Sequence, residues 1–484
     1  MSHTNLTEAS AVDRLRDIVG ASHVYTEAAD TSKYLIDWTG EYSGEALAVV
    51  RPGSTKEVSE LVIYCRENGI VIVPQGGQTG LAGGGIPVGS SPTIVVSLTR
   101  MNSIRSLDDA GRTVVAEAGV VLETLQNHVA QKGLLFPLMF GAKGSCTIGG
   151  NLATNAGGSN VLRYGNTREL CLGIEAVMAD GSIVNGLNGL RKDNTGYDIK
   201  DLLIGSEGTL AIITAAVFKL FPTPLTRETA FLSVASVDAA IKTLNILQDR
   251  SGNSVEAFEY IPQPVVNAVC KAFPTIRAPL NGNVPTGVLL EISSSRLSDA
   301  ETDETGSSHL AKELLDSLDT LIEAGLVEDG VIAQSEQQRA DFWRLRESVL
   351  EALLAYGSTY HFDISLPLEH VSTFLEIMDP KATALGFELL TIGHLGDGNL
   401  HYALACSDSD RWKALPLEEA KKEAFTLLRA LGGSFSAEHG IGQSKLDVMK
   451  NLKDPAQLSL MRSIKHAIDP TGIFNPGKLI PFDE

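Results

Sequence analysis

The sequence has few cysteines, and their pattern lacks the marks of a disulfide framework or a cysteine metal site. Five occur among 484 residues, and no two form a CxxC pair; they are Cys65, Cys146, Cys171, Cys270 and Cys406. An odd number of scattered cysteines between apolar residues is typical of reduced thiols. The pattern predicts a cytoplasmic protein and argues against a zinc knuckle or an iron–sulfur centre.

The chain also lacks long apolar runs and an excess of basic residues. No stretch of 18 uncharged apolar residues occurs, and the first eight residues have neither the basic nor the apolar region of a signal peptide. The 39 Lys and Arg against 59 Asp and Glu give a formal net charge of −20, which argues against nucleic acid as a partner but allows a small anionic ligand. Because 484 residues exceed one core, we expect two or three domains.

Two familiar nucleotide-binding motifs are absent, although glycine is abundant. No GxxxxGK[ST] sequence occurs, so there is no P-loop lysine. Residues 74–87 contain six glycines and follow the apolar run Ile70–Val73; a strand at 93–98 comes next, where a Rossmann turn requires a helix. The backbone N–H groups of such a loop can form a concave anion site that suits a pyrophosphate. The segment indicates a nucleotide bound by another architecture, with a flexible surface turn as the alternative.

Two further glycine-rich segments follow. Residues 141–158 have hardly any large side chains, which predicts a flat or extended ligand lying against the backbone. The alternative, a disordered linker, would be richer in charge and proline. A third glycine turn at 206–208 leads into a strand that ends near residue 214.

The order of expected elements changes near Phe221–Pro224. Before this point a β-α-β-β-β-α order predicts a mixed α+β domain, with a helix capped by Thr55 that buries Val58, Leu61, Val62 and Cys65. After it, single strands alternate with helices, including a helix over 337–355, which suits a sheet with helices on one face. The sequence predicts domains at 1–222 and 223–450 and a separate segment at 451–484.

A histidine-bearing hairpin carries the clearest chemistry. Strands at 387–392 and 400–405 flank a GDGN turn, which should bring His394 and His401 close together. Imidazoles completed by a carboxylate are typical of catalytic divalent-metal sites, and Glu438 could be the third ligand. The adjacent His439 would then face a substrate as a base, if the backbone there is extended. The alternative is two surface histidines and an unrelated Glu-His pair.

Arg346 lies beside the apolar stripe of the helix expected at 337–355. An arginine at such an edge is usually paired or reaches to solvent. It could instead bind a substrate carboxylate with its planar fork.

Six motifs together resemble the FAD-linked oxidases of the vanillyl-alcohol-oxidase, or PCMH, type: PQGGQTGLAGG, GSCTIGGNLATNAGG, IGSEGTLAIIT, GHLGDGNLHY, AEHGIG and NPGK. The resemblance covers about residues 30–480 and is strongest to the D-2-hydroxyacid dehydrogenases, which act on D-2-hydroxyglutarate or D-lactate. It implies an α+β fold in which 1–222 is a two-subdomain FAD-binding domain. A substrate and metal domain with an antiparallel sheet and helices would follow at 223–450, and 451–484 would return to the flavin.

The resemblance assigns cofactor residues position by position. The pyrophosphate would lie on Pro74, Gly76, Gly77, Gln78, Thr79 and Gly80. The flavin and its ribityl chain would be lined by Gly144, Ser145, Thr147, Gly150, Asn151, Asn155, Gly157 and Gly158. The adenine and isoalloxazine would approach Glu207, Gly208, Ile213 and Asn475. Some relatives attach FAD through His or Cys, but Gln78 stands where such a His would be and Cys146 is one position away from a second attachment point, so we expect noncovalent FAD.

The same resemblance makes His394, His401 and Glu438 the ligands of a divalent metal, usually zinc. It makes His439 the catalytic base and Arg346 the anchor of the substrate carboxylate. His439 would take the hydroxyl proton while the Cα hydride passes to FAD. The hydroxyacid would thereby become the 2-oxoacid.

Two positions depart from the pattern of the hydroxyglutarate enzymes. His361 replaces a Lys and Leu350 replaces a Thr, and in the family both residues contact the distal carboxylate of the substrate. The losses weaken that contact, so D-lactate or a longer apolar 2-hydroxyacid rivals D-2-hydroxyglutarate.

Other interpretations remain open. An FAD-dependent sugar or phenol oxidase would use the glycine loops but not the His394, His401 and Glu438 triad, and a noncatalytic flavin carrier would not be reduced by a hydroxyacid. Electron-transfer flavoprotein or a quinone could accept the electrons. Relatives are often homodimers.

Overall fold

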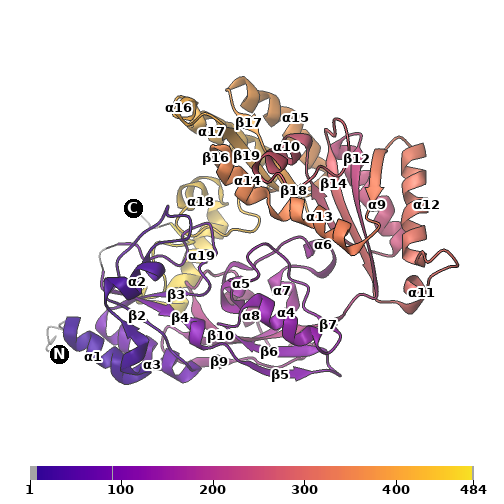
Figure 1. Ribbon diagram of the computed structural model, residues 1–484. Coiled ribbons are helices and arrows are strands. Elements are labelled where there is room, and N and C mark those ends of the chain that lie inside the picture. The colour runs from indigo at the N-terminus through magenta and orange to yellow at the C-terminus, as the bar shows by residue number, and fades with distance from the viewer. Residues whose placement is uncertain (1–7, 90, 482–484) are drawn as a thin grey trace. The chain divides into compact units, whose positions relative to one another are not determined.

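The computed structural model describes residues 8–89 and 91–481, and contacts divide the chain into two units (Figure 1). Unit 1 comprises Met1–Gly157, Asn166–Pro222 and Glu438–Glu484, and unit 2 comprises Gly158–Gly165 and Thr223–Ala437. One division therefore falls at Pro222. Another follows Ala437, before the boundary placed at residue 450 from the sequence. Within the described residues, no helix has the length and apolar character needed to cross a membrane.

Unit 1 begins with a small four-stranded sheet. Its order is β1 (Val24–Tyr25), β2 (Ala48–Val50), β4 (Thr93–Ser97) and β3 (Val71–Gln75), with β2, β4 and β3 mutually parallel. Helices α1 (Glu8–Val19) and α3 (Thr55–Asn68) bury their apolar residues in the same core. The cap of α3 expected at Thr55 is wrong by one residue. Ser54 has extended backbone and its hydroxyl accepts a hydrogen bond from the Glu57 amide, as an N-cap requires.

A second sheet of unit 1 is antiparallel throughout. Its five strands run in the order β5 (Ile104–Asp108), β6 (Thr113–Glu117), β10 (Ala211–Lys219), β8 (Cys171–Met178) and β9 (Ile183–Asn185). The helices that contact this sheet include α3, α5 (Ile148–Thr154) and α7 (Thr167–Leu170), and α4 (Leu122–Ala130) follows β6 in the chain. The second glycine-rich stretch is thus partly helical. A Cβ at Gly149 would lie 2.7 Å from that of Ala118, so glycine lets α5 approach the sheet closely.

The C-terminal segment of unit 1 follows α18 (Leu446–Leu452) and α19 (Pro455–Ile468) and joins the first sheet. The Ile72 amide donates to Ile473 O at 2.8 Å, and the Asn475 amide donates to Ile72 O at 2.9 Å. Phe474 therefore pairs in parallel with Ile72 beside β3. The remaining short elements of unit 1 are η1 (Ala21–His23), α2 (Ala28–Leu35), η2 (Leu98–Arg100), β7 (Leu134–Leu135), α8 (Ile199–Leu203) and β11 (Phe221–Pro222).

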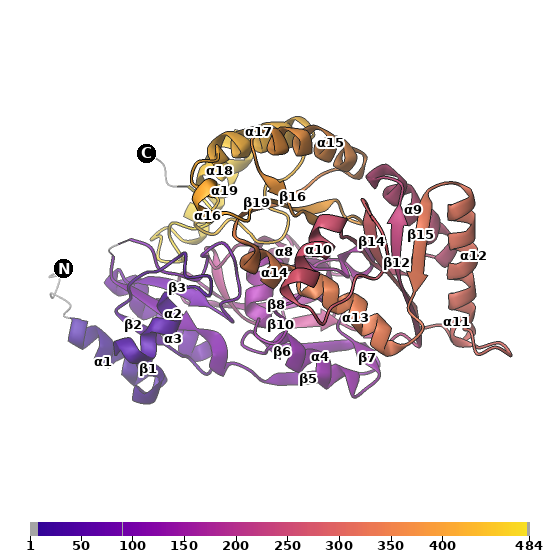
Figure 2. The same ribbon diagram turned by 45° about the horizontal axis from the view of Figure 1, so that its top comes forward.

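Unit 2 is built on an eight-stranded antiparallel sheet. Its order is β15 (Val327–Ile332), β12 (Thr226–Val234), β14 (Gly287–Ser294), β13 (Val255–Tyr260), β18 (Ile392–His394), β19 (Asn399–Cys406) and β16 (Ser358–Ser365), with β17 (Glu388–Leu389) also pairing with β19. Helices α15 and α17 lie side by side (Figure 2). The helices are α6 (Val161–Tyr164), α9 (Val237–Ser251), α10 (Gln263–Ala272), α11 (Leu297–Ala300), α12 (His309–Glu323), α13 (Glu336–Glu347), α14 (Val349–Tyr356), α15 (Leu368–Ala384), α16 (Ser409–Trp412) and α17 (Leu417–Ala430).

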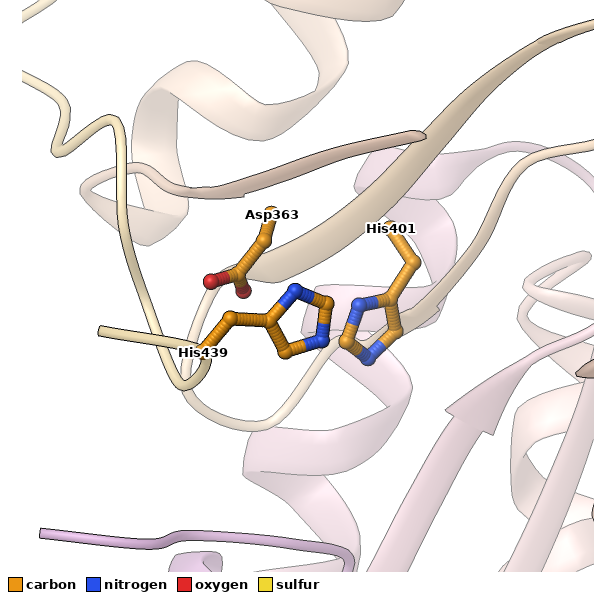
Figure 3. A group of neighbouring side chains, drawn as sticks. All are labelled: Asp363, His401 and His439. Carbon is orange, nitrogen blue, oxygen red and sulfur yellow. The ribbon is translucent and has the colours of Figure 1, made fainter. Parts of the chain in front are cut away.

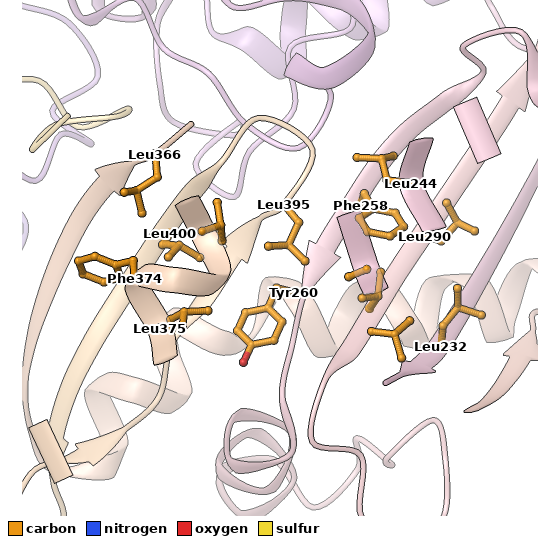
Figure 4. Close-up of a cluster of buried hydrophobic side chains, with 14 of the residues drawn as sticks. Leu232, Leu244, Phe258, Tyr260, Leu290, Leu366, Phe374, Leu375, Leu395 and Leu400 are labelled. Carbon is orange, nitrogen blue, oxygen red and sulfur yellow. The ribbon is translucent and has the colours of Figure 1, made fainter. Parts of the chain in front are cut away.

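Both faces of this sheet are covered, so the expectation of helices on one face was wrong. Leu232 and Leu290 belong to a core with residues of α9, α12, α15 and α17 (Figure 4). The preceding residues Phe231 and Leu289 belong to a separate core with residues of α10, α13 and α14. Because successive strand residues point to opposite faces, two adjacent apolar residues require cover on both sides. The helix expected over 337–355 is interrupted at Ser348, giving α13 and α14.

Residues 158–165, which belong to unit 2 although the residues on either side of them belong to unit 1, are held in unit 2 by ion pairs and hydrogen bonds to a buried carboxylate. The Arg163 Nη1 donates to Glu256 Oε1 at 3.0 Å and to Ser293 O at 2.8 Å, and the Tyr164 hydroxyl donates to Glu256 Oε1 at 2.6 Å. Arg227 lies 3.5 Å from the other oxygen of Glu256, whose side chain is 2% exposed. One buried carboxylate therefore balances two guanidinium groups.

We expect Glu256→Ala to destabilise unit 2 by about 3–5 kcal/mol, because it leaves the charge of Arg163 uncompensated and leaves Arg227 with only its second partner, Glu291, at 3.2 Å. Chemical denaturation measures the loss. Glu423→Ala, which removes the exposed ion pair with Lys381, should leave the midpoint unchanged. Equal midpoints for the two variants would contradict the role of this network.

Candidate functional site

The hairpin of β18 and β19 brings two histidines together, as its sequence predicts. The ring centroids of His394 and His401 are 5.4 Å apart. His394 pairs with Asn399 and Ile392 pairs with His401 across the hairpin. Gly398 has φ +76°, and a Cβ there would overlap Leu366 O, so only glycine fits the turn.

Glu438 and His439 join these histidines in two overlapping groups. His394, His401 and Glu438 each have one potential ligand atom within 4.8 Å of the others. Asp363, His401 and His439 meet the same distance limit (Figure 3). The backbone at 438–439 forms a bend rather than a strand, so alternation along an extended chain does not direct the two side chains here.

The backbone of unit 2 explains why residues 438 and 439 reach this place. Ser365 and Ser434 exchange two backbone hydrogen bonds, and the Ala437 amide donates to Asp363 O at 3.2 Å. Contacts assign Glu438 and His439 to unit 1, but Glu438 is bonded directly to Ala437. Chain connectivity therefore holds both residues beside the end of β16.

Asp363 is a site residue that the sequence reasoning missed. It lies on β16 directly opposite His401 on β19, and it is 1% exposed. Cross-strand partners share one face of a sheet, which is why the carboxylate is near the imidazole. The Asn399 amide and the Ser436 hydroxyl lie 3.4 Å from its two oxygens. Only the register, which the sequence did not reveal, could have identified it.

Glu259 is the second missed residue. It is fully buried on β13, where it pairs with His394 on β18. His394 Nδ1 lies 2.8 Å from its Oε1, and Arg346 Nε lies 2.6 Å from its Oε2. Burial alone would raise the pKa of Glu259, but the charges and hydrogen bonds of His394 and Arg346 hold it well below the usual value. Arg346 is thus a paired arginine, as one of its two interpretations expects.

These contacts suit a metal ligand set. A histidine that donates Nδ1–H to a carboxylate keeps a lone pair on Nε2, and such partners are typical of metal-binding histidines. His394 Nε2 lies 3.4 Å from Arg346 Nη2. Two imidazoles and a carboxylate are a donor set that suits zinc.

The two positions that depart from the family pattern also lie in unit 2. His361 is on β16, opposite Ala403, and its Nε2 lies 2.9 Å from Thr359 Oγ1. His361 and Asp363, two residues apart on one strand, point to the same face. Leu350 is on α14 and is 42% exposed.

A cavity of about 420 Å³ in unit 1 lies between the first two glycine-rich segments. Its lining includes Gly76, Gly77, Gln78, Ser145 and Thr147, all expected cofactor residues. A Cβ on Gly76 or Gly77 would overlap Thr147 or Ser145, respectively. The buried Thr147 Oγ1 has no hydrogen-bond partner in the described part of the chain. The close approach of the two backbone segments and the hydroxyl group without a hydrogen-bond partner suit a phosphate-bearing cofactor.

Glu207 and Asn475 hold unit 1 together near its glycine turns. The buried Glu207 carboxylate accepts hydrogen bonds from the Ile441 and Gly442 amides at 2.8 and 2.7 Å, and burial raises its pKa. Asn475 Nδ2 donates to Gly84 O at 3.0 Å and Glu207 O at 2.8 Å. Four segments far apart in sequence are thereby fixed to one another.

The other expected cofactor residues are distributed around these segments. Pro74 lies on β3, and Gly208, with φ +69°, is so close that its Cβ would lie 3.1 Å from the proline ring. Asn155 ends α5, and its side chain accepts from the Arg168 amide at 2.9 Å. Gly158 belongs to unit 2. The others lie in unit 1: Thr79, Gly80, Gly144, Gly150, Asn151, Gly157 and Ile213.

Lys478 was missed as a candidate, although it stands in the NPGK motif. It is 2% exposed, and its ammonium group has no hydrogen-bond partner among residues 8–89 and 91–481. Burial lowers its pKa to about 8, against the attraction of Glu207. A buried cation in unit 1 also suits an anionic cofactor.

Comparison with family models gives two matches. Residues 46–186 match a model described as FAD binding domain, and residues 223–479 match FAD linked oxidases, C-terminal domain. The second match covers more than half of the chain.

Similar curated proteins cover most of the chain. D-2-hydroxyglutarate dehydrogenase, mitochondrial, of Bos taurus is 38% identical over 95% of this chain and 81% of its own length. D-2-hydroxyglutarate dehydrogenase of Xanthomonas citri pv. viticola is 36% identical over 96% of each chain. A putative mitochondrial D-lactate dehydrogenase of Schizosaccharomyces pombe is 37% identical over 94% of this chain and 86% of its own.

Solved structures share the fold at lower identity. p-Cresol methylhydroxylase with substrate bound aligns with a TM-score of 0.76 at 16% identity, covering 99% of both chains. An alkyldihydroxyacetonephosphate synthase aligns with a TM-score of 0.71 at 18% identity, covering 98% of this chain and 86% of its own. These alignments confirm the expected fold class.

We expect Gly77→Ala to lower bound FAD, because the added methyl group forces the first two glycine-rich segments apart. The ratio of flavin absorbance to protein absorbance measures the loss. Gly141→Ala is the control, since a Cβ there meets nothing within 4 Å. Full FAD content in Gly77→Ala, or an equal loss in Gly141→Ala, would contradict the proposal that FAD binds between the first two glycine-rich segments.

Proposed function

Because the chain belongs to the family of FAD-linked oxidases, we propose that it oxidises a D-2-hydroxyacid to the 2-oxoacid with FAD and a divalent metal. A donor set of two imidazoles and one carboxylate favours zinc as that metal. FAD dependence and the dehydrogenase class follow from the family and the named relatives. The metal is supported by one observation above all: His394, His401 and Glu438 present ligand atoms within 4.8 Å of one another.

Three residues of unit 2, together with Glu438, suit the binding half of this reaction. His394, His401 and Glu438 would bind the cation, and the guanidinium group of Arg346 would bind the substrate carboxylate. When bound, the cation supplies a Lewis acid that lowers the pKa of the substrate hydroxyl, and FAD supplies the hydride acceptor. Arg346 and His394 are held by hydrogen bonds to the buried Glu259, so the substrate would meet a preorganised site.

His439 is placed to remove the hydroxyl proton. It groups with His401 and Asp363, so its ring lies beside a ligand histidine and a buried carboxylate. A carboxylate near the imidazole favours the imidazolium formed when the ring takes a proton. The hydroxyl proton would go to His439 and the Cα hydride to the flavin, which balances the two-electron oxidation.

Noncovalent FAD is supported by the state of the nearest possible attachment residues. Cys146 is buried, and burial raises the pKa of its thiol to about 11, which disfavours the thiolate. Gln78 is an amide whose Nε2 donates to Tyr34 O at 3.1 Å. Neither side chain is a ready nucleophile.

The substrate follows less directly from the residues. The relatives named D-2-hydroxyglutarate dehydrogenase favour a dicarboxylate. Leu350 and His361, in place of the Thr and Lys of the hydroxyglutarate pattern, favour D-lactate or a longer apolar 2-hydroxyacid. Anaerobic flavin bleaching by a panel of D- and L-2-hydroxyacids, with metal content measured on the same sample, separates these from a sugar or phenol oxidase.

The acceptor, assembly and location are proposals from the family resemblance. We propose electron-transfer flavoprotein or a quinone as acceptor and a homodimer as the assembly. The five cysteines are free, which fits a reducing compartment such as the cytoplasm. The bovine relative is named as mitochondrial, and the Xanthomonas relative carries no location in its name.

We expect His439→Ala to retain FAD but to lose at least about 100-fold in the rate of flavin reduction, because no group takes the hydroxyl proton. Anaerobic stopped-flow absorbance measures this rate. His466→Ala, on α19, is the control. Wild-type reduction in His439→Ala would exclude His439 as the base.

We expect His361→Lys combined with Leu350→Thr to raise kcat/KM for D-2-hydroxyglutarate relative to D-lactate by about 10–100-fold, since a charge-assisted hydrogen bond contributes about 1.5–3 kcal/mol. Steady-state kinetics with both substrates gives the ratio. Leu354→Thr alone is the control, because Leu354 is exposed on the same helix as Leu350. An unchanged ratio in the first variant would remove these positions from substrate selection.

A further inference from the structure

We propose that Glu259 is a positioning residue that fixes a metal ligand and the substrate anchor with one carboxylate. It holds the His394 imidazole with Nε2 available to a cation and holds Arg346 beside it. The inference rests on the proposed metal site and assigns a role to a residue outside the ligand set. All three residues belong to unit 2.

The two oxygens of Glu259 are divided between the two partners. His394 Nδ1 lies 2.8 Å from Oε1, and Arg346 Nε lies 2.6 Å from Oε2. The carboxylate side chain is fully buried, and the side chains of His394 and Arg346 are 8% and 15% exposed. Because β13 and β18 pair in register at Glu259 and His394, the backbone sets this contact.

The hydrogen bond decides which nitrogen of His394 can bind a cation. A neutral imidazole has one N–H donor and one acceptor nitrogen. A carboxylate only accepts, so the proton resides on Nδ1 and the lone pair on Nε2. Without this partner the ring could turn over or carry its proton on Nε2, and either change removes the ligand atom.

The Glu259 carboxylate also reduces the repulsion between a cation bound to His394 and the guanidinium group of Arg346. Arg346 Nη2 lies 3.4 Å from His394 Nε2, so a cation on that nitrogen would lie near a guanidinium group. Like charges at such separations repel strongly in a poorly solvated site. The negative charge of Glu259, which is hydrogen-bonded to both Arg346 and His394, offsets this repulsion. A cation and the Arg346 guanidinium group could therefore both contact the same small carboxylate-bearing substrate.

Glu291 supplies a matched comparison within the same sheet. It lies on β14 opposite Ala257, two residues from Glu259 along β13 and on the same face. It is also buried and is bound by Arg339 Nε at 2.9 Å, Trp343 Nε1 at 2.7 Å and Thr229 Oγ1 at 2.8 Å. It thus pairs with an arginine of α13, as Glu259 does, but with no histidine.

The test compares Glu259→Gln with Glu291→Gln in the FAD-loaded protein after removal of metal by a chelator. Glutamine keeps the shape but presents an NH₂ group to one donor, and it removes the negative charge. We expect the affinity for Zn²⁺, measured by competition with a chelating dye, to fall by about 10–100-fold in Glu259→Gln. Glu291→Gln should bind Zn²⁺ as the wild-type protein does. FAD content and melting temperature check that both variants are folded.

The outcomes are distinct. Wild-type affinity in Glu259→Gln, or an equal loss in Glu291→Gln, would overturn the role of Glu259 while leaving the metal site intact. A wild-type protein that binds no Zn²⁺, Mn²⁺ or Co²⁺ would overturn the metal site itself, and the inference with it. If Glu259→Gln does not fold, Glu259→Asp replaces it. The shorter side chain keeps the charge but withdraws the oxygen from His394, so the same loss of affinity is expected.

Discussion

The register of the strands β13, β18, β19 and β16 is the constraint on which the candidate site depends. It places Glu259 opposite His394 and Asp363 opposite His401. Cross-strand partners lie on one face, and a slip of one residue would turn each strand's side chains to the other face. The apolar residues between them, such as Tyr402 and Phe258, fill the core on the opposite side. Because side chains alternate between the two faces of the sheet, one face packs in the core of unit 2 and the other brings the polar residues of the candidate site together.

Unit 1 depends on a different constraint, the close approach of backbones that only small residues allow. Gly76 and Gly77 lie against Thr147 and Ser145 so closely that a Cβ would overlap them. Asn475 then ties the first glycine loop to the turn at Glu207 with one amide group. Hydrogen bonds satisfy the Glu207 carboxylate and the Asn475 Nδ2 group, as burial of polar groups requires. Thr147 Oγ1, Asn151 Nδ2, Asn475 Oδ1 and Lys478 Nζ have no such partner among residues 8–89 and 91–481, and they mark where an anionic cofactor would contribute the missing contacts.

Sequence reasoning succeeded where the signal was local and failed where it depended on register. The GDGN turn between two strands was enough to place His394 near His401, because a hairpin fixes its own geometry. The residues alone made Glu438 only a possible third ligand, since no periodicity links it to the hairpin, and the family resemblance then singled it out. Asp363 and Glu259 lie on strands whose pairing partners are distant in sequence, so no spacing identified them. The sequence did not reveal that the helix expected over 337–355 is interrupted at Ser348, or that helices cover both faces of the sheet in unit 2. Tertiary packing decides both features.

The balance of charge explains why the proposed reaction would depend on a bound cation. Arg346 Nη2 lies 3.4 Å from His394 Nε2, but Glu259 already neutralises the guanidinium group through a hydrogen bond of 2.6 Å. Glu438 adds a further negative charge to the ligand group. A 2-hydroxyacid is itself an anion, so these residues alone would repel it or hold it weakly. A divalent ion held by His394, His401 and Glu438 would reverse the sign of the local charge, and Arg346 would then attract the substrate carboxylate together with it. The formal charge of −20 for the whole chain does not oppose this, because the groups within a few ångströms dominate a poorly solvated site.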